Sequence, residues 1–392
     1  MKYFFKRDTI FATLSVFIVM GLFTLIPLNL HVLDPLKMAL TDVSFNDLSF
    51  SALKSHRNNP IDDKIVIVNI GDADRTSIAA VVRKVNEAQP KAVGLDVLFL
   101  APNTPAADSA LAGAIAQTPN IVLSDKLEFG TDQLTNKNYF SSYSKYSGYV
   151  NFVGENSGVI RYFSPFEKWK DSLNYSFATA VIKASDEVRF KSFQKRSNDL
   201  EFINYRRQAD QYFTIDYHDL LTDKVSPTVF NDKIVLIGLV DNNPSNIEDK
   251  HFTPLNEKFI GKSIPDMNGV VIHANIISMI LENNYIKSSP SWFNWFLAVM
   301  LTWVFMAFII KYFIERHIWF HLAAKVVQLL ISVLFIYLGI ILGKYLNVYI
   351  GLSAPLVAIV LSVDVLYFYE GFAKWANKKF GFKNIFLKAV HK

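Results

Sequence analysis

The chain contains no cysteine and little charge. Only 19% of its 392 residues are Asp, Glu, Lys or Arg, whereas 51% are hydrophobic. The absence of cysteine excludes disulfides, thiolate zinc sites, iron–sulfur clusters and thiol nucleophiles. Low charge together with a mean hydropathy of +0.21 excludes a disordered chain and argues against an ordinary soluble enzyme.

Four long hydrophobic runs account for the high hydropathy. A membrane-spanning helix needs about 20 apolar residues, and residues 10–30 meet that length. A cleaved signal peptide is the alternative, but signal runs are shorter and no small-residue cleavage site follows this one. We therefore interpret residues 10–30 as an uncleaved anchor. The other runs predict membrane helices at residues 291–310, 326–343 and 348–368.

The charges that flank these runs indicate their orientation. Lysine and arginine gather in residues 1–9, 311–325 and 369–392, and such residues favour the cytoplasmic side of a membrane. We therefore expect four spans, both termini in the cytoplasm and residues 31–290 outside it. Residues 31–289 carry a net charge of −4 and the remainder +9. An acidic outer domain argues against binding of nucleic acid.

Aromatic side chains alternate with lysines in the predicted cytoplasmic tail, residues 369–392. Membrane topology alone is sufficient to explain the lysines. The pattern also fits a helix that contacts anionic membrane lipid, or a docking site for a cytoplasmic partner. These alternatives stay open, and the candidate contact residues are Lys374, Trp375, Lys378 and Lys379.

Strand and helix patterns alternate between the first and second runs. Residues 64–70 (KIVIVNI) form a continuous β-branched run, which is typical of a buried parallel strand. The alternation predicts an α/β fold with a doubly wound, mostly parallel sheet and an antiparallel hairpin inserted at residues 148–166. The predicted strands are 64–70, 91–99, 120–124, 202–205 and 233–240, and the predicted helices are 76–87, 106–117, 174–184 and 270–281.

Carboxylates lie at the ends of the predicted strands, where ligands of such sheets bind. Asp72 and Asp74 follow the first strand. Asp96 interrupts the second strand, and Asp241 follows the strand at 233–240. Paired carboxylates could hold a divalent cation. In the alternative, structural interpretation, Asp74, Thr76 or Ser77 caps the next helix and Asp96 accepts backbone hydrogen bonds. Both interpretations stay open, and so does the presence of a metal.

No sequence motif indicates an enzyme. The chain lacks a glycine-rich phosphate loop, a Walker motif, and the G-x-S-x-G and H-E-x-x-H patterns. His251 and His273 have acidic neighbours in the sequence, but a lone histidine is more often a core residue than a ligand or a base. We therefore expect no catalytic residue and no cofactor.

One acidic residue lies within the last hydrophobic run. Asp364 stands near the predicted cytoplasmic end of the span at 348–368, and a carboxylate at mid-membrane is unfavourable by about 3 kcal/mol. Lys325 immediately precedes the span at 326–343, at the same predicted depth. We predict that the two side chains pair. The alternative is that Asp364 reaches the lipid headgroups.

Several motifs, taken in order, resemble the CHASE2 family of extracytoplasmic sensor domains in bacterial transmembrane receptors. The resemblance covers most of residues 40–285, and its most specific motif places Gly269, His273 and Asn275 in register with the family pattern. The loop after the first strand, DADRTS, is shorter than is usual in the family. The matching motifs are NDLSF, KIVIVNIGDAD, KAVGLDVLF, GVIR, INY, NDKIVLIG, EDKHFTP and MNGVVIHANIISMIL.

The resemblance implies a sensor in the bacterial inner membrane, with one span before its domain and three after it. Family members usually continue into an output domain, whereas this chain ends shortly after its last run. We therefore expect this chain to bind a small ligand or an envelope protein outside the cytoplasm. A separate cytoplasmic or membrane signalling protein would then carry the output. A non-sensing envelope scaffold is the alternative function, and a homodimer stays open. The candidate ligand-binding residues are Asp72, Asp74, Asp96, Arg161, Asp241, His273 and Asn275.

Overall fold

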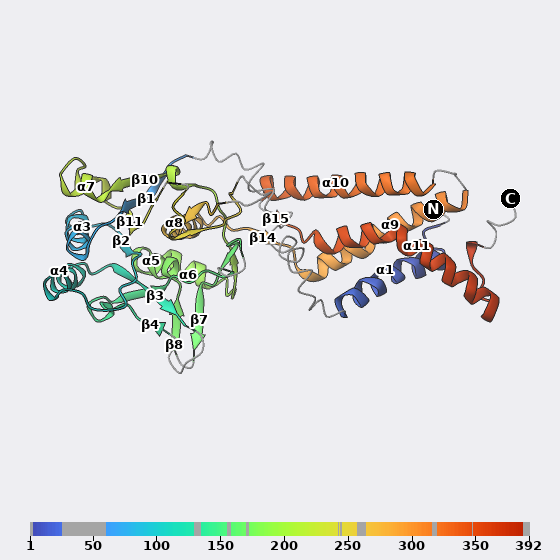
Figure 1. Cartoon of the computed structure of the whole chain (residues 1–392), viewed down its shortest axis with the longest axis horizontal. Coiled ribbons are helices and arrows are strands. Elements are labelled where there is room, and N and C mark those ends of the chain that lie inside the picture. Colours follow the sequence, from blue (N-terminus) through green and yellow to red (C-terminus); the bar gives the residue numbers. More distant parts are fainter. Residues whose placement is uncertain are drawn as a thin grey trace. The chain divides into compact units, whose positions relative to one another are not determined.

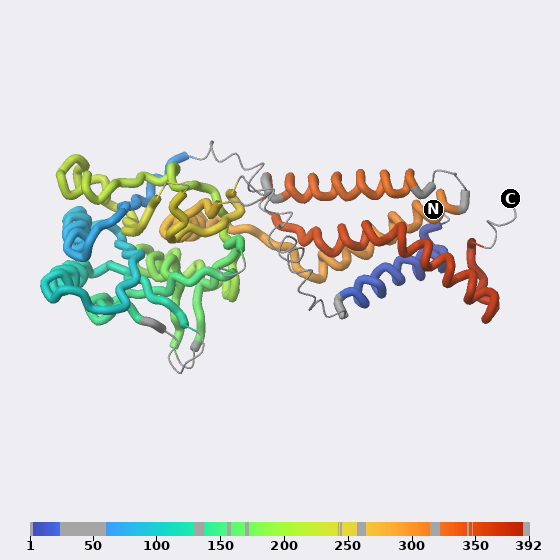
Figure 2. Tube along the Cα trace, in the orientation of Figure 1, coloured from blue at the N-terminus to red at the C-terminus, as the bar shows by residue number. Residues whose placement is uncertain are grey.

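The computed structural model divides the chain into two compact units, which are described separately (Figures 1 and 2). The sheet unit comprises residues 50–286, and the helical unit comprises residues 1–49 together with 287–392. The structure describes residues 3–25, 60–128, 135–154, 158–169, 172–241, 243, 245–256, 264–315, 320–346 and 348–386.

A parallel sheet of six strands forms the centre of the sheet unit, in the order β10–β1–β11–β2–β3–β5. A short seventh strand, β4, pairs antiparallel with β3. The strand bounds are β1 Asp62–Asn69, β2 Ala92–Leu95, β3 Ile121–Leu127, β4 Thr135–Asn136, β5 Tyr146–Tyr149, β10 Tyr212–Asp216 and β11 Ile234–Gly238.

Helices cover both faces of this sheet, which explains why its central strands are hydrophobic without alternation. One face packs α3 Arg75–Glu87, α4 Pro105–Ala116 and α7 Tyr217–Leu221 against alternate residues of β1 and β2. The other face packs α5 Phe177–Ser185 and α8 Gly269–Glu282, and α6 Glu187–Gln194 packs on α5 (Figure 1). A side chain at Gly94 would lie within 3.0 Å of Phe177, so glycine permits the close approach of α5 to β2.

The predicted α/β fold is confirmed, with shifts at the element boundaries. The strand predicted at 91–99 ends at Leu95. The hairpin predicted at 148–166 is shorter than expected: among the described residues it is one antiparallel bridge, between Val153 and Tyr162, and its turn at 155–157 lies outside the description. Tyr162 also pairs with β9 (Glu201–Phe202), a contact distant in sequence that no local pattern predicts.

Short elements complete the sheet unit. An antiparallel hairpin lies just after the predicted one, between β7 and β8, and β12 pairs with β13 immediately before α8. Their bounds are β6 Tyr162–Phe163, β7 Phe166–Trp169, β8 Ser172–Tyr175, β9 Glu201–Phe202, β12 Lys250–His251, β13 Met267–Asn268, η4 Ser141–Tyr143, η6 Ala209–Gln211 and η7 Pro227–Phe230.

The helical unit contains α1 Arg7–Leu25, α9 Ser291–Glu315, α10 Phe320–Leu346 and α11 Ser353–Phe380, with β14 Lys287–Ser288 pairing β15 Val348–Tyr349. Within the described residues, three helices are long and apolar enough to cross a membrane, at Ser291–Phe313, Leu322–Leu342 and Ser353–Phe380. The predicted first span continues past Leu25 into residues outside the description. The span predicted at residues 10–30 therefore stays a prediction, and so does the location of residues 31–290 outside the cytoplasm.

Small residues and a few polar contacts hold these helices together. α1, α9 and α11 pack around a core that includes Ala12, Met306 and Ala358, and small side chains at such sites let helices approach closely. Gln328 Nε2 donates to the carbonyl of Ile359 at 2.6 Å, which joins α10 to α11.

Candidate functional site

A cavity of about 420 Å³ lies in the sheet unit at the carboxyl ends of the parallel strands. We call it the strand-end cavity. Residues directly after β1, β2, β5 and β11 line it, together with the first residue of α8. This is the edge of an open α/β sheet at which ligands bind. The lining residues are Ile70, Asp96, Val97, Leu98, Lys126, Val150, Asn151, Phe152, Leu239, Glu248, Asp249, His251, Gly269 and His273.

Asp96 is the carboxylate most altered by this environment. Its backbone N–H still donates to the carbonyl of Ile237 at 2.8 Å, so the residue continues the β2–β11 ladder beyond the end of the strand. Burial raises the pKa of the Asp96 carboxyl to about 8, and the negative charge of Asp249 adds to the rise. Asp96 is therefore largely protonated at neutral pH when no cation is beside it.

Two histidines and a phenylalanine form an aromatic wall of the cavity. The ring of Phe152 stacks on His273, with centroids 4.8 Å apart, and meets the ring of His251 edge-on at 5.1 Å. His273 is 3% exposed and its Nδ1 has no hydrogen-bond partner among the described residues. Burial lowers the pKa of His273 to about 3, and proximity to His251 adds to the effect, so the imidazole is neutral at physiological pH.

The first turn of α8 is connected to the loop that carries Asp249 and His251. The N–H of Gly269 donates to the Asp249 carbonyl at 3.2 Å and to its Oδ2 at 3.3 Å. A carboxylate in this position is favoured by the positive end of the helix dipole. Asp266 accepts from Thr253 through both carboxylate oxygens, at 2.8 and 2.5 Å, and burial raises the Asp266 pKa to about 6.

The structure brings two of the seven predicted ligand-binding residues together in the cavity, Asp96 and His273. Asp72 and Asp74 are exposed and do not line it. Asp72 accepts from the Tyr217 hydroxyl at 3.0 Å. Asp74 caps α3 by accepting from the N–H of Ser77 at 2.7 Å, which lowers its pKa.

The remaining predicted residues make contacts elsewhere in the sheet unit. Asp241 accepts from the N–H of Asn243 at 2.7 Å and from the side-chain amide of Asn246 at 2.5 Å, and the first of these bonds is the main reason its pKa is lowered. The Arg161 carbonyl accepts from the N–H of Ile203 at 3.0 Å, between β6 and β9. Neither Asp241 nor Arg161 lines the cavity.

Asn275 is 2% exposed and holds the backbone of the loop before β10. Its Oδ1 accepts from the N–H groups of Arg206 and Arg207, both at 3.1 Å. Its Nδ2 donates to the carbonyl of Arg207 at 2.9 Å and to that of Val271 at 3.0 Å. Nδ2 also lies 3.8 Å from the sulfur of Met267. Because three of its bonds go to the backbone of residues 206 and 207, the amide positions that backbone on α8.

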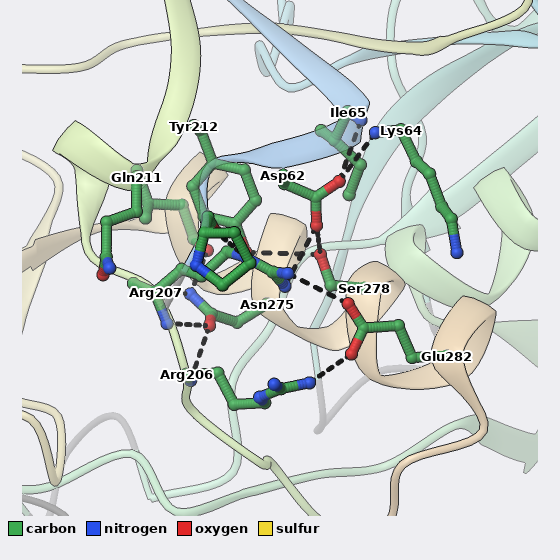
Figure 3. Close-up of polar contacts among 12 residues, drawn as sticks. Asp62, Lys64, Ile65, Arg206, Arg207, Gln211, Tyr212, Asn275, Ser278 and Glu282 are labelled. Atoms are coloured by element: carbon green, nitrogen blue, oxygen red, sulfur yellow. Dashed lines mark hydrogen bonds and ion pairs between the residues drawn. The ribbon is translucent and has the colours of Figure 1, made fainter. Parts of the chain in front are cut away.

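A second polar cluster lies at the far end of α8 and was not predicted from the sequence (Figure 3). We call it the Asp62 cluster. Arg207 Nη1 lies 3.1 Å from Asp62 Oδ2, and Arg207 Nη2 donates to Glu282 Oε1 at 3.0 Å. The Ser278 hydroxyl donates to Asp62 Oδ2 at 2.6 Å. Arg206 also pairs with Glu282. The adjacent arginines at 206 and 207 were the sequence signal that could have indicated it.

In the helical unit, Lys325 Nζ lies 2.6 Å from Asp364 Oδ2, an ion pair between α10 and α11. Among the predicted tail contacts, Lys374 pairs with Glu370 on the same helix at 2.7 Å. Lys379 lies over the ring of Trp375, 5.4 Å from its centroid, and Lys378 occupies the last turn of α11. The helix thus continues through the first half of the segment predicted as a tail.

Among the residues that the structure describes, no three His, Asp or Glu side chains lie close enough together to hold a metal ion. The hypothesis that Asp72, Asp74, Asp96 or Asp241 holds a divalent cation therefore receives no support from the described residues. The strand-end cavity offers carboxyl groups, the neutral imidazole of His273, one lysine, one amide and six apolar side chains.

Comparison with known proteins connects this geometry to a family. The family model described as the CHASE2 domain matches residues 14–311, which is most of the chain. No curated protein and no solved structure matches the chain. The matched region contains both the strand-end cavity and the Asp62 cluster, whereas the ion pair between Lys325 and Asp364 lies beyond it.

Proposed function

The chain belongs to the CHASE2 domain family, and from this premise we propose that it is a membrane-anchored sensor. The sheet unit would bind a small ligand in the strand-end cavity, outside the cytoplasm, and α8 would pass the change toward the membrane helices. A separate cytoplasmic or membrane protein would receive the signal. The family is one of sensory extracellular domains, which supports the sensory role.

The observation that carries this proposal is the course of α8. Its first residue, Gly269, and His273 line the cavity, while its last residue, Glu282, belongs to the Asp62 cluster. The chain enters the helical unit at Lys287, shortly after α8 ends, and α9 begins at Ser291. One helix therefore connects the binding cavity with the segment that leads to a candidate membrane span.

α8 is suited to transmit a displacement because it is a buried, rigid element. Every residue from Gly269 to Ile280 is buried, so a shift at one end requires repacking along its whole length. A ligand moves such an equilibrium only by the difference in its affinity for the two states. Contacts with Gly269 and His273 place a ligand directly on the helix, where such a difference can arise.

A small ligand is favoured over an envelope protein by the shape of the site. Binding cavities for small molecules usually have volumes of about 300–1,000 Å³ with mostly apolar walls and a few polar groups. The strand-end cavity has a volume of about 420 Å³, which lies within that range, although polar or charged side chains make up about half of its lining. The proposal assigns it no catalytic step, since a histidine with a pKa of about 3 is a weak base.

Binding can be tested by thermal unfolding of the full chain in detergent against a library of small metabolites. Saturation at 100 times the dissociation constant stabilises the folded state by about 2.7 kcal/mol, which raises the melting temperature measurably. Leu98→Trp fills the cavity wall and should abolish the shift. Leu100→Trp is the matched control, because Leu100 is 57% exposed and does not line the cavity.

If no small molecule stabilises the chain while an envelope protein binds it, the scaffold alternative is correct and the sensor proposal fails. Transmission is tested separately with a single reporter cysteine, which is practical because the chain has none. The alkylation rate of Lys287→Cys should change when ligand saturates the cavity. Val188→Cys on α6, 78% exposed, should not change.

A further inference from the structure

We propose that the strand-end cavity selects a small organic cation, an ammonium group carried on an apolar body. This inference rests on the proposed function, because it names the chemical class of the ligand for the same cavity. Four features of the lining support it: its charge, a carboxyl group without a partner, a buried imidazole nitrogen without a partner, and its apolar side chains.

The lining has an excess of negative charge. Glu248 and Asp249 are acidic side chains, Asp96 adds a third carboxyl group that holds a proton until a cation binds, and Lys126 is the single lysine or arginine among the lining residues. His273 is neutral at physiological pH. The electrostatic field inside the cavity therefore attracts cations, and a low-dielectric wall strengthens that attraction.

Asp96 lacks the partner that a carboxylate in a protein wall normally has. Its side chain makes no hydrogen bond to any residue in the described part of the chain, and the charge of Asp249 opposes its ionisation. Removing a carboxylate from water without a partner is unfavourable, so the group holds a proton unless a cation replaces it. An ammonium ion supplies both the charge and the hydrogen-bond donors that Asp96 lacks.

His273 provides an independent sign that the wall is incomplete. The side chain is almost fully buried beside the cavity, yet its Nδ1 has no hydrogen-bond partner among the described residues. Buried polar atoms without partners are rare, and each calls for a specific explanation. An imidazole held neutral beside a bound ammonium ion avoids the repulsion that a second positive charge would cause.

The rest of the lining fits the apolar part of such a ligand. An ammonium ion requires one or two carboxylates, whereas a divalent metal requires a larger oxygen shell, and the described residues offer no set of three acidic or histidine ligands. A bare metal ion would also leave the hydrophobic walls in contact with water. The apolar lining residues are Ile70, Val97, Leu98, Val150, Phe152 and Leu239.

Binding of an ammonium ion displaces the proton of Asp96 to solvent below about pH 8. The positive ligand and the protonated carboxyl combine to give an ammonium–carboxylate pair and one free proton. The charged or titratable groups that line the same cavity are Lys126, Glu248, Asp249, His251 and His273. These groups can also take up or release protons when ligand binds. The contribution of Asp96 is therefore the difference in total proton release between the wild-type chain and Asp96→Asn.

The test is isothermal titration calorimetry on the full chain with matched probes that differ only in their polar group. The amines are phenethylamine and hexylamine, and their controls are 2-phenylethanol, hexanol, phenylacetate and hexanoate. We expect an amine to bind saturably. The corresponding alcohol and carboxylate should bind at least tenfold more weakly or not detectably. Proton release on amine binding should appear as a difference in binding enthalpy between buffers of different ionisation enthalpy.

Variants assign the binding to the cavity. Asp96→Asn should weaken amine binding at least tenfold and remove the proton release, and Asp249→Asn, at a more exposed position, should weaken it severalfold. Asp72→Asn is the matched control, because Asp72 follows β1 at the same sheet edge but lies outside the cavity. Circular dichroism checks that each variant is folded, and Asp249→Asn keeps the test decisive if Asp96→Asn does not fold.

Two outcomes would overturn the inference. The first is that an alcohol or a carboxylate binds more strongly than the amine and that Leu98→Trp abolishes this binding. The cavity would then prefer another class of ligand, and the sensor proposal would stay intact. Absence of amine binding would also overturn it. Failure of the sensor proposal is different, since it requires that no compound of any class stabilises the chain through the cavity.

Discussion

Arg207 and Asp62 form a buried ion pair, with 6% and 3% of their side chains exposed and 3.1 Å between Nη1 and Oδ2 (Figure 3). Asp62 is the first residue of β1, near the point at which the sheet unit begins. Arg207 also binds Glu282, the last residue of α8, near the point at which the unit ends. Arg207 therefore connects the two segments through which the sheet unit is continuous with the helical unit.

Breaking this pair should strongly destabilise the sheet unit. Removing one partner of a buried ion pair costs about 3–5 kcal/mol, because the other charge stays buried without compensation. We expect Asp62→Asn and Arg207→Met each to lower the free energy of unfolding by about that amount in urea denaturation. The double variant should cost less than the sum of the two single changes. Additive costs would show that the two charges do not interact.

Asn275 should prove to be a structural residue. Three of its hydrogen bonds join α8 to the backbone of residues 206 and 207. Asn275→Ala leaves several buried backbone groups unpaired, so we expect it to lower the free energy of unfolding by about 2–4 kcal/mol. Ligand affinity, measured on the folded fraction at low temperature, should change less than threefold. A tenfold loss of affinity with unchanged stability would instead make Asn275 a ligand contact.

Asp96 should make the sheet unit less stable as the pH rises. Its pKa is about 8 in the folded chain against 3.8 ordinarily, so the folded state binds more protons between these values and stability falls as pH increases through them. Asp266, with a pKa of about 6, acts in the same direction only below that pH. His273, with a pKa of about 3 against 6.5, acts in the opposite direction only below pH 6.5.

The interval from pH 6.5 to 8 therefore isolates Asp96 among these three groups. The wild-type free energy of unfolding should fall there by up to about 1.4 kcal/mol per pH unit relative to Asp96→Asn, since one proton is involved. Urea denaturation in detergent at several pH values measures the slope. Asp72→Asn should keep the wild-type slope, and an equal slope in Asp96→Asn would show that Asp96 is ionised throughout.

Lys325 and Asp364 should be energetically coupled. Their 2.6 Å contact joins two helices that are candidate membrane spans. Polar contacts between membrane helices contribute about 0.5–2 kcal/mol. We expect a double-mutant cycle with Lys325→Gln and Asp364→Asn, measured by resistance to unfolding in sodium dodecyl sulfate, to give coupling in that range. Destabilisation by Asp364→Asn that is the same with Lys or Gln at position 325 would indicate that Asp364 contacts the headgroups instead.

Several structural features could be predicted because their signals are local. The β-branched run at 64–70 and the periodic apolar residues at 76–87 depend on neighbours within one element, and the structure has β1 and α3 there. Asp74 as a helix cap is also a local contact, with Ser77. The hairpin at 148–166 was predicted from local alternation and is present only as the bridge between Val153 and Tyr162, whereas the pairing of Tyr162 with Phe202, about forty residues away, had no local signal.

The candidate site could be predicted only in part. Asp96 stood out because an acid within a continuous apolar strand requires a specific environment, and it lies in the cavity. Asp72, Asp74 and Asp241 were equally close to strand ends in the sequence but lie outside the cavity. Their side chains are directed by the turns that follow each strand, which strand patterns do not specify. Asp249 and its contact with Gly269 required the β12–β13 pairing.

Composition and periodicity were therefore enough to indicate an α/β domain and apolar helices that could cross a membrane, since each depends on residues near one another in the chain. The family was indicated by a resemblance in several short motifs taken in order, and the family match confirms it. The cavity, the raised pKa of Asp96 and the ion pair between Asp62 and Arg207 required the folded chain. Each depends on distance, burial and charge among side chains that are tens to hundreds of residues apart, and the packing of strands and helices brings them together.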